Sequence, residues 1–276
     1  GLTHQKITLN ESSMWSGSKD AEALNPEASK YLSEIRELLF AGKHKEAENL
    51  IYKTFVCGGK GSGQGNGAKT PYGSYEVGGF LHLDWSHYIP CSSYKRSLDL
   101  NHGESKEIIE VAGKPFRLKT LYSSYVSDVN VINIYNQTPA ARQDTLRLSM
   151  SRPENGYSSV RDGFITLSGS LPNGRGGQGL SYAIVAKPLL LHGGKLIARG
   201  NELLIVDAPV IQILIAHNTN YYNPQLSLVE EGIDQIMTAA GTSPAALECD
   251  HRQAFAESMT RVQMRIGNAG SMAEGL

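Results

Sequence analysis

The chain has 276 residues, 40% of them hydrophobic, and its 26 Lys and Arg residues nearly balance its 27 Asp and Glu residues, for a formal net charge of −1. This length suits one large β domain of up to roughly 250 residues plus a short extra segment, and the balanced charge excludes the basic excess typical of nucleic-acid-binding proteins. No stretch approaches the roughly 18 apolar residues of a membrane-spanning helix, so neither a nucleic-acid nor a membrane partner is expected.

The first part of the chain predicts a strand followed by two helices. Residues 4–9 alternate in polarity and predict a strand. Asn25 is the expected N-cap of a helix that begins at Pro26 and ends at Gly42, because these residue types favour those helix ends. A second helix is expected over residues 44–54, so the two helices form a hairpin.

A glycine-dense loop covers residues 57–67 and invites comparison with a phosphate-binding loop. Residues 63–70 (GQGNGAKT) fall one position short of that motif, because Ala68 stands where its second glycine should be. Pro71 also disfavours helical backbone at the residue before it, whereas a phosphate-binding loop opens a helix. We therefore interpret this segment as a linker loop.

From about residue 77 to residue 217 the sequence has the pattern of short strands and turns that is typical of a β domain. Short alternating or β-branched runs are separated by turn residues, with no helix expected between them and no internal repeat. Examples of the expected strands are Phe80–Asp84, Arg117–Tyr122, Val129–Tyr135, Leu146–Met150, Phe164–Leu167, Tyr182–Ala186, Leu203–Val206 and Val210–Ala216. This spacing predicts a mainly β fold, a large antiparallel β-sandwich.

Two further helices are expected after Pro224. The first ends at Gly241 and carries an apolar set made of Leu226, Val229, Ile233, Ile236 and Met237. The second starts at Ser243 and carries Leu247, Phe255, Met259, Val262 and Ile266. These helices either lie back on the sandwich or begin a helical region. The expected division is a β-sandwich domain over 1–223, containing the hairpin 26–55, and a helical linker over 224–276.

The residues that could carry chemistry show no strong catalytic or metal-binding pattern. His82, His87 and Cys91 are spaced too loosely for a structural zinc site, so neither a metal nor another cofactor is expected. The three cysteines are far apart and are expected to be unpaired: Cys57, Cys91 and Cys249. Glycoside hydrolysis needs two carboxyl groups about 5–10 Å apart, but nothing pairs the available candidates, which are Glu11, Glu76, Asp84, Asp128 and Asp207. No catalytic residue is assigned.

Aromatic side chains in or beside loops give a stronger indication of a binding site than the groups above. They are Trp15, Tyr72, Tyr75, Trp85 and Tyr88. Exposed rings can stack on the apolar face of a sugar, whereas the alternative is that they cover the sandwich core. Trp15 is the best candidate for a sugar contact, because it lies in a polar loop.

Several motifs resemble a known enzyme family in order and spacing. Residues 7–17 (ITLNESSMWSG) are similar to the "LNE…WSG" stretch of glycoside hydrolase family 95, whose members are α-L-fucosidases and related α-L-galactosidases. The likeness continues in register through residues 25–28, 35–43, 46–48, 72–75, 79–83, 94–100, 117–123, 128–129, 151–153 and 163–169.

This resemblance implies an N-terminal β-sandwich, a helical linker, an (α/α)6 barrel that holds the catalytic Glu and Asp, and a small C-terminal β domain. His251, Phe255, Arg261, Val262 and Gly267 resemble the linker just before the barrel, although Ala254 stands where the family often has Asp. The chain stops at Leu276, so the barrel is expected to be missing from it. Family likeness also favours a bacterial, periplasmic or secreted protein.

Three functions therefore stay open. The first is a non-catalytic domain that buttresses the catalytic barrel of an enzyme acting on α-L-fucosyl or related glycans, with Trp15 and Tyr75 near the substrate. The second is a stand-alone carbohydrate-binding module. The third is a structural domain that self-associates as a homodimer through apolar faces of its C-terminal helices.

Overall fold

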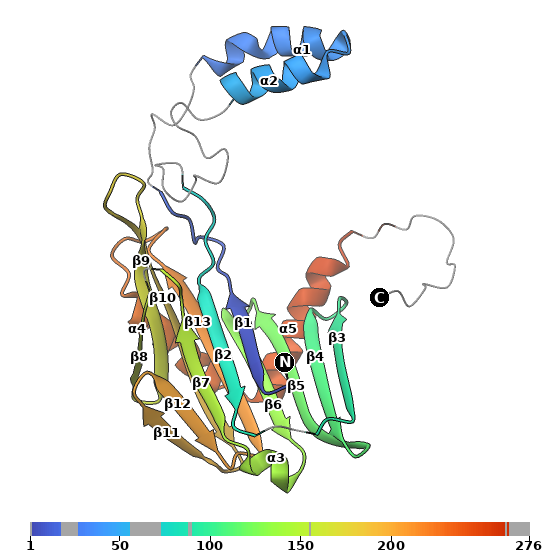
Figure 1. The fold of residues 1–276 in the computed structure, drawn as a ribbon, viewed down its shortest axis with the longest axis vertical. Helices are drawn as coiled ribbons and strands as arrows, with labels where there is room; N and C mark the ends of the chain where they lie inside the picture. Colours follow the sequence, from blue (N-terminus) through green and yellow to red (C-terminus); the bar gives the residue numbers. More distant parts are fainter. Residues whose placement is uncertain are drawn as a thin grey trace.

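The computed structural model describes residues 2–17, 27–55, 73–87, 90–154, 156–262 and 264. Two antiparallel sheets pack face to face in it (Figure 1). The five-stranded sheet has the order β1 (His4–Leu9), β2 (Gly79–Trp85), β7 (Leu146–Ser151), β12 (Glu202–Val206), β11 (Lys195–Arg199). The eight-stranded sheet has the order β3 (Ser93–Asp99), β4 (Glu104–Val111), β5 (Lys114–Ser124), β6 (Val129–Asn136), β13 (Val210–Thr219), β10 (Gln178–Leu191), β9 (Phe164–Pro172), β8 (Tyr157–Arg161). The expected mainly β sandwich is confirmed.

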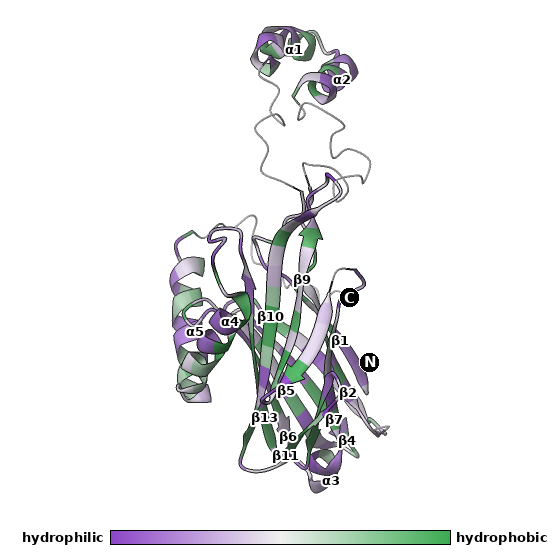
Figure 2. Ribbon diagram, turned by 90° about the vertical axis from the view of Figure 1, so that its left-hand side faces the viewer, coloured by the Kyte–Doolittle hydropathy of each residue, from purple (hydrophilic) through white to green (hydrophobic). Residues whose placement is uncertain are grey.

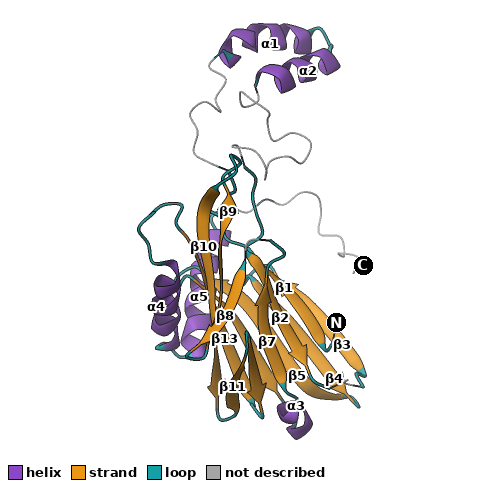
Figure 3. Ribbon diagram, turned by 60° about the vertical axis from the view of Figure 1, so that its left-hand side comes forward, coloured by secondary structure: helices purple, strands orange, loops and turns teal. Residues whose placement is uncertain are grey.

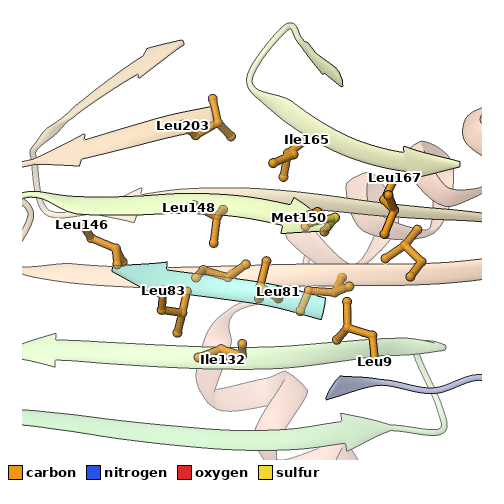
Figure 4. Packing of buried hydrophobic residues seen from close by; sticks show 14 of the residues in the cluster. Leu9, Leu81, Leu83, Ile132, Leu146, Leu148, Met150, Ile165, Leu167 and Leu203 are labelled. Carbon is orange, nitrogen blue, oxygen red and sulfur yellow. The ribbon is translucent and has the colours of Figure 1, made fainter. Parts of the chain in front are cut away.

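The core lies between the two sheets, where alternate residues of each strand point inward. Leu81 and Leu83 of β2 are fully buried and belong to the same apolar cluster as Ile132 of β6 (Figure 4). Each such side chain contributes roughly 1.5–3 kcal/mol to folding by leaving water. This shared core positions the loops at the sandwich ends.

All eight expected strands are present, mostly one to several residues longer than expected. The strands β3, β4, β8 and β11 were not among the expected segments. In β3, every residue is exposed, because this strand forms the edge of the larger sheet, so its sequence lacks an apolar period. Its charged Lys95 and Arg96 are typical of an edge that resists further pairing.

A short helix interrupts the β region, where none was expected. The helix α3 (Pro139–Gln143) links β6 to β7 and begins after Thr138, whose hydroxyl accepts a hydrogen bond from the Ala141 N–H at 3.1 Å. One turn and a half is too short for a helical period to be recognised in the sequence.

The helical hairpin consists of a short 3-10 helix (Ala28–Tyr31), α1 (Leu32–Phe40) and α2 (His44–Thr54). Gly42 ends the first helix as predicted. Its φ is +73°, and the Lys43 N–H donates to the Leu38 carbonyl at 2.9 Å, a closing bond of the Schellman type. The predicted N-cap, Asn25, lies with Pro26 outside the described residues, as does the glycine-dense loop 57–67.

The helix α4 (Leu228–Ala240) lies on the outer face of the larger sheet (Figure 2). Ile236 and Ala239 are buried there against Val185 and Leu214. The predicted apolar set was wrong at Met237, which is 51% exposed, and at Leu226, which precedes the helix. Since the apolar face of α4 is covered by the sheet, it does not offer the open surface on which the expected self-association rested.

The helix α5 (Pro244–Met259) also lies against the larger sheet (Figure 3), where it contacts β5. It begins as predicted, because the Ser243 hydroxyl accepts a hydrogen bond from the Ala246 N–H at 3.3 Å. The predicted continuation to Val262 was wrong, since the helix ends at Met259 and Val262 is exposed beyond it; Ile266 lies outside the described residues. None of the helices in the described ranges has the length and apolar character needed to cross a membrane.

Candidate functional site

Trp15 and Tyr75 come together at one end of the sandwich. Trp15 lies in the loop after β1, Tyr75 lies in the segment before β2, and the two form an isolated antiparallel bridge. Their ring centroids are 5.6 Å apart with an interplanar angle of 69°, an edge-to-face arrangement that aromatic pairs favour. The side chains remain 48% and 43% exposed, so the rings offer apolar surface to a ligand.

The backbone around this pair is tightly packed. Gly73 has φ +64°, and a Cβ atom there would lie 1.7 Å from the carbonyl oxygen of Ser16. The Gly17 N–H donates to the Pro172 carbonyl at 2.8 Å, which ties this loop to the end of β9. Trp15 is oriented by its indole N–H, which donates to the Ser12 carbonyl at 3.0 Å. The aromatic pair is therefore held in a defined position before any ligand arrives.

Trp15 lines a hollow of about 540 Å³, and none of the described residues in its wall is charged. Three amide side chains contribute to this wall: Asn173, Gln178 and Asn220. The Asn173 side-chain oxygen accepts hydrogen bonds from the Arg175 and Gly177 N–H groups at 2.8 and 3.0 Å. The Asn220 oxygen accepts from the Ser181 N–H at 2.9 Å. An aromatic ring beside oriented amides is suited to a neutral polar ligand.

The amide residues of this hollow were missed in the sequence. Asn173 does lie in the turn signal Pro172-Asn173-Gly174, so a loop at that position was recognisable. Asn220 follows directly after β13, where the strand signal ends. Nothing local to either residue indicates that their loops meet Trp15, which lies more than 150 positions earlier in the chain.

The other aromatic candidates do not join this site. Trp85 is buried at the opposite end of β2, and the guanidinium carbon of Arg117 lies 4.4 Å from its ring centroid. The alternative of a core-covering role is confirmed for Trp85. Tyr72 and Tyr88 lie outside the described residues.

The candidate carboxylates are dispersed, with one exception. Glu76 pairs with Arg152 at 3.5 Å, Asp84 pairs with Arg147 at 3.3 Å, and Asp207 occupies a turn with φ +52°. Only Glu11 and Asp128 line the same hollow, which is separate from that of Trp15. Solvated, paired or turn positions thus account for most of these carboxylates.

The candidate zinc ligands have other partners. His82 lies 2.7 Å from the Ser151 hydroxyl, His87 lies 3.1 Å from Asp144, and the Cys91 thiol donates to the Ser93 carbonyl at 3.0 Å. Within the part of the chain that the structure describes, no three His, Cys, Asp or Glu side chains are grouped to hold a metal ion. Cys91 and Cys249 are free thiols, and Cys57 lies outside the described residues.

The family model described as "Glycosyl hydrolase family 65, N-terminal domain" matches residues 1–224. A similar solved structure, described as a putative kojibiose phosphorylase from human microbiome, is 10% identical with a TM-score of 0.44; the match covers 63% of this chain and 27% of that chain. No curated protein matches. The family match supports the expected N-terminal region of a glycoside hydrolase; it names family 65 and does not support family 95 specifically.

Proposed function

The chain belongs to the family of glycosyl hydrolase family 65 N-terminal domains, and on that premise we propose that it is a non-catalytic domain of a larger glycoside hydrolase. Its work is to support a catalytic (α/α)6 barrel and to contribute one edge of the sugar-binding surface. The observation that carries the proposal is the Trp15–Tyr75 pair, which is half-exposed beside a hollow whose described lining residues carry no charge.

The ligand class follows from the wall of this hollow. A sugar ring has an apolar face, which stacks on an aromatic ring, and hydroxyl groups that both donate and accept hydrogen bonds. Asn173, Gln178 and Asn220 have amide groups that can do the same. We propose α-L-fucosyl or related glycans as the substrates of the enzyme, because residues 7–17 resemble family 95. This substrate assignment rests on the resemblance alone.

The helical hairpin supports the proposed barrel partner. Among the residues that the structure describes, the hairpin carries apolar side chains that stay exposed: Tyr31, Leu32, Leu39, Phe40, Ile51, Tyr52 and Phe55. Apolar surface that is contiguous and exposed marks an interaction site. A neighbouring domain of the same enzyme is the occupant that we propose for it.

The non-catalytic role is tested by incubating the chain with an aryl α-L-fucoside and an aryl α-L-galactoside. We expect release of the aryl group at the background rate, since the described residues bring together no oriented pair of carboxylates beside the aromatic pair. Turnover above background that survives repurification would refute the non-catalytic assignment.

The sugar-binding role is tested by calorimetry with α-L-fucosylated and α-L-galactosylated oligosaccharides. We expect weak saturable binding that falls about fivefold in Trp15→Ala, because the stacking surface is lost. Tyr157→Ala is the matched control, since Tyr157 is an exposed aromatic residue of β8 outside the wall of the hollow. Equal affinities for the two variants would argue against Trp15 as a sugar contact. Absence of heat with both oligosaccharides would rule out a carbohydrate-binding module that works alone.

A further inference from the structure

A second hollow, of about 290 Å³, lies between the start of the loop after β1 and the turn that joins β5 to β6. Asn10 and Glu11 form one side of it, Asp128 and Asn130 form another, and His217 of β13 lines it as well. Tyr125 also lines it and is 91% exposed. Except for Val129, its described wall consists of side chains that are able to form hydrogen bonds.

His217 is the unusual member of this wall. Both of its ring nitrogens are buried, and neither has a hydrogen-bond partner among the residues that the structure describes. An unpaired buried polar group costs about 1–3 kcal/mol, so such groups are nearly always satisfied by protein, water or ligand. Gly78 packs closely against the imidazole, since a Cβ atom at position 78 would lie 2.1 Å from the Cε1 atom of His217. The ring is thus enclosed on the protein side.

The protonation state of the His217 imidazole depends on its burial. Burial lowers the pKa of His217 to about 4, so the imidazole is neutral near pH 7. A neutral imidazole offers one donor and one acceptor, which is the pairing that a hydroxyl group needs.

The charged side chains that line this hollow limit the kinds of ligand that it can bind. Glu11 and Asp128 contribute carboxylates, and none of the described residues that line the hollow is Lys or Arg, so phosphate and other anions are disfavoured. The described residues also lack a cluster of metal ligands here. Asp128 is held in place by the Gln235 amide of α4, which donates to its carboxylate at 2.9 Å. Fixed acceptors, amides and a neutral imidazole suit a neutral molecule with several hydroxyl groups.

We propose that this hollow binds a single neutral sugar ring, with Tyr125 against the face of the ring and His217, Asp128 and Asn130 toward its hydroxyl groups. A ligand hydroxyl would give His217 the partner that the described protein groups do not supply. This site is separate from the Trp15–Tyr75 site and stands on its own lining residues, so it does not depend on the proposed function.

The test is saturation-transfer NMR on the full chain with L-fucose, D-galactose and D-glucose as probes. We expect transfer to at least one sugar and a shift of the His217 imidazole nitrogens in a ¹⁵N correlation spectrum as that sugar is added. Tyr125→Ala should weaken binding about fivefold while leaving the fold intact, because the side chain is almost fully exposed. Tyr157→Ala, on β8, should leave binding unchanged.

Two more variants test the polar wall. Asp128→Asn should weaken binding, whereas Asp162→Asn should not; both positions have left-handed backbone, φ +51° and +52°, which Asn tolerates. His217→Phe, combined with Trp15→Ala so that the aromatic site does not contribute, should abolish saturation transfer to the sugar. Tyr157→Ala in the same Trp15→Ala background is the control that should leave the transfer unchanged. The proposal is overturned by absence of transfer from all three sugars, by His217 nitrogens that do not respond because they pair only with water, or by binding that survives Tyr125→Ala but not Trp15→Ala.

Discussion

The imidazole of His251 stacks on the phenol ring of Tyr122, with ring centroids 4.7 Å apart and an interplanar angle of 23°. The His251 Nε2–H also donates to the His102 carbonyl at 2.8 Å, in the turn between β3 and β4. One residue on, Arg252 makes a bidentate pair with Glu104 at 2.6 and 2.8 Å. These contacts attach α5 to the sandwich.

His251→Ala is expected to lower the free energy of unfolding by about 2 kcal/mol, because it removes a buried ring and a hydrogen bond. Urea denaturation followed by circular dichroism measures this loss. Gln253→Ala is the matched control, since Gln253 is an exposed residue of the same helix and should change stability by less than about 0.5 kcal/mol. Equal effects of the two substitutions would show that α5 is not attached through His251.

Protein stability is expected to fall between pH 6.5 and pH 4 because of His217. Burial lowers its pKa in the folded protein to about 4, below the ordinary value of 6.5 that the unfolded chain has. Below pH 6.5 the unfolded chain takes up a proton that the folded protein does not, so up to about 3 kcal/mol is lost as the pH approaches 4. Urea denaturation at several pH values measures the slope. In His217→Phe the fall of the unfolding free energy between pH 6.5 and pH 4 should become smaller by this amount. An unchanged pH dependence would show that His217 is not its cause.

Gly73→Ala is expected to destabilise the aromatic site by roughly 3 kcal/mol, because its Cβ would meet the Ser16 carbonyl at 1.7 Å in addition to straining a left-handed backbone. Gly113→Ala is the control, since Gly113 has a similar φ of +72° but open space around it. That change should cost only about 1–2 kcal/mol. Thermal unfolding compares the two variants, and indole fluorescence reports on Trp15; comparable losses would show that the close approach to Ser16 is unimportant.

Arg117→Met is expected to cost about 3–5 kcal/mol, because it leaves the buried Asp144 carboxylate without its cation. Arg117 donates to Asp144 at 3.1 Å and to the Asn136 side-chain oxygen at 2.8 Å. Adding Asp144→Asn to this variant should recover part of the loss, since the unpaired charge is then removed. Chemical denaturation of the single and double variants measures the coupling. A double variant less stable than the sum of its single changes would contradict this account.

Local sequence patterns predicted the elements of this fold well. The alternation in Phe80–Asp84 identified β2 because one face of that strand is buried, and Gly42 identified a helix end because it adopts a positive φ at low cost. Ser243 identified the start of α5 by its capping hydroxyl. These signals act over a few residues, so they are readable without knowing what the chain packs against. The edge strand β3 was not predicted, because neither of its faces is buried and its sequence therefore has no apolar alternation.

The sequence by itself therefore determined the mainly β class, the helical hairpin and the aromatic loop around Trp15. Only the tertiary structure decided which loops meet. It placed Tyr75 edge-on to Trp15, brought Asp128 and His217 to the hollow that Glu11 lines, and left Trp85 in the core. The physical reason is that strand order and register bring distant positions together, and both depend on how the whole chain buries its apolar surface.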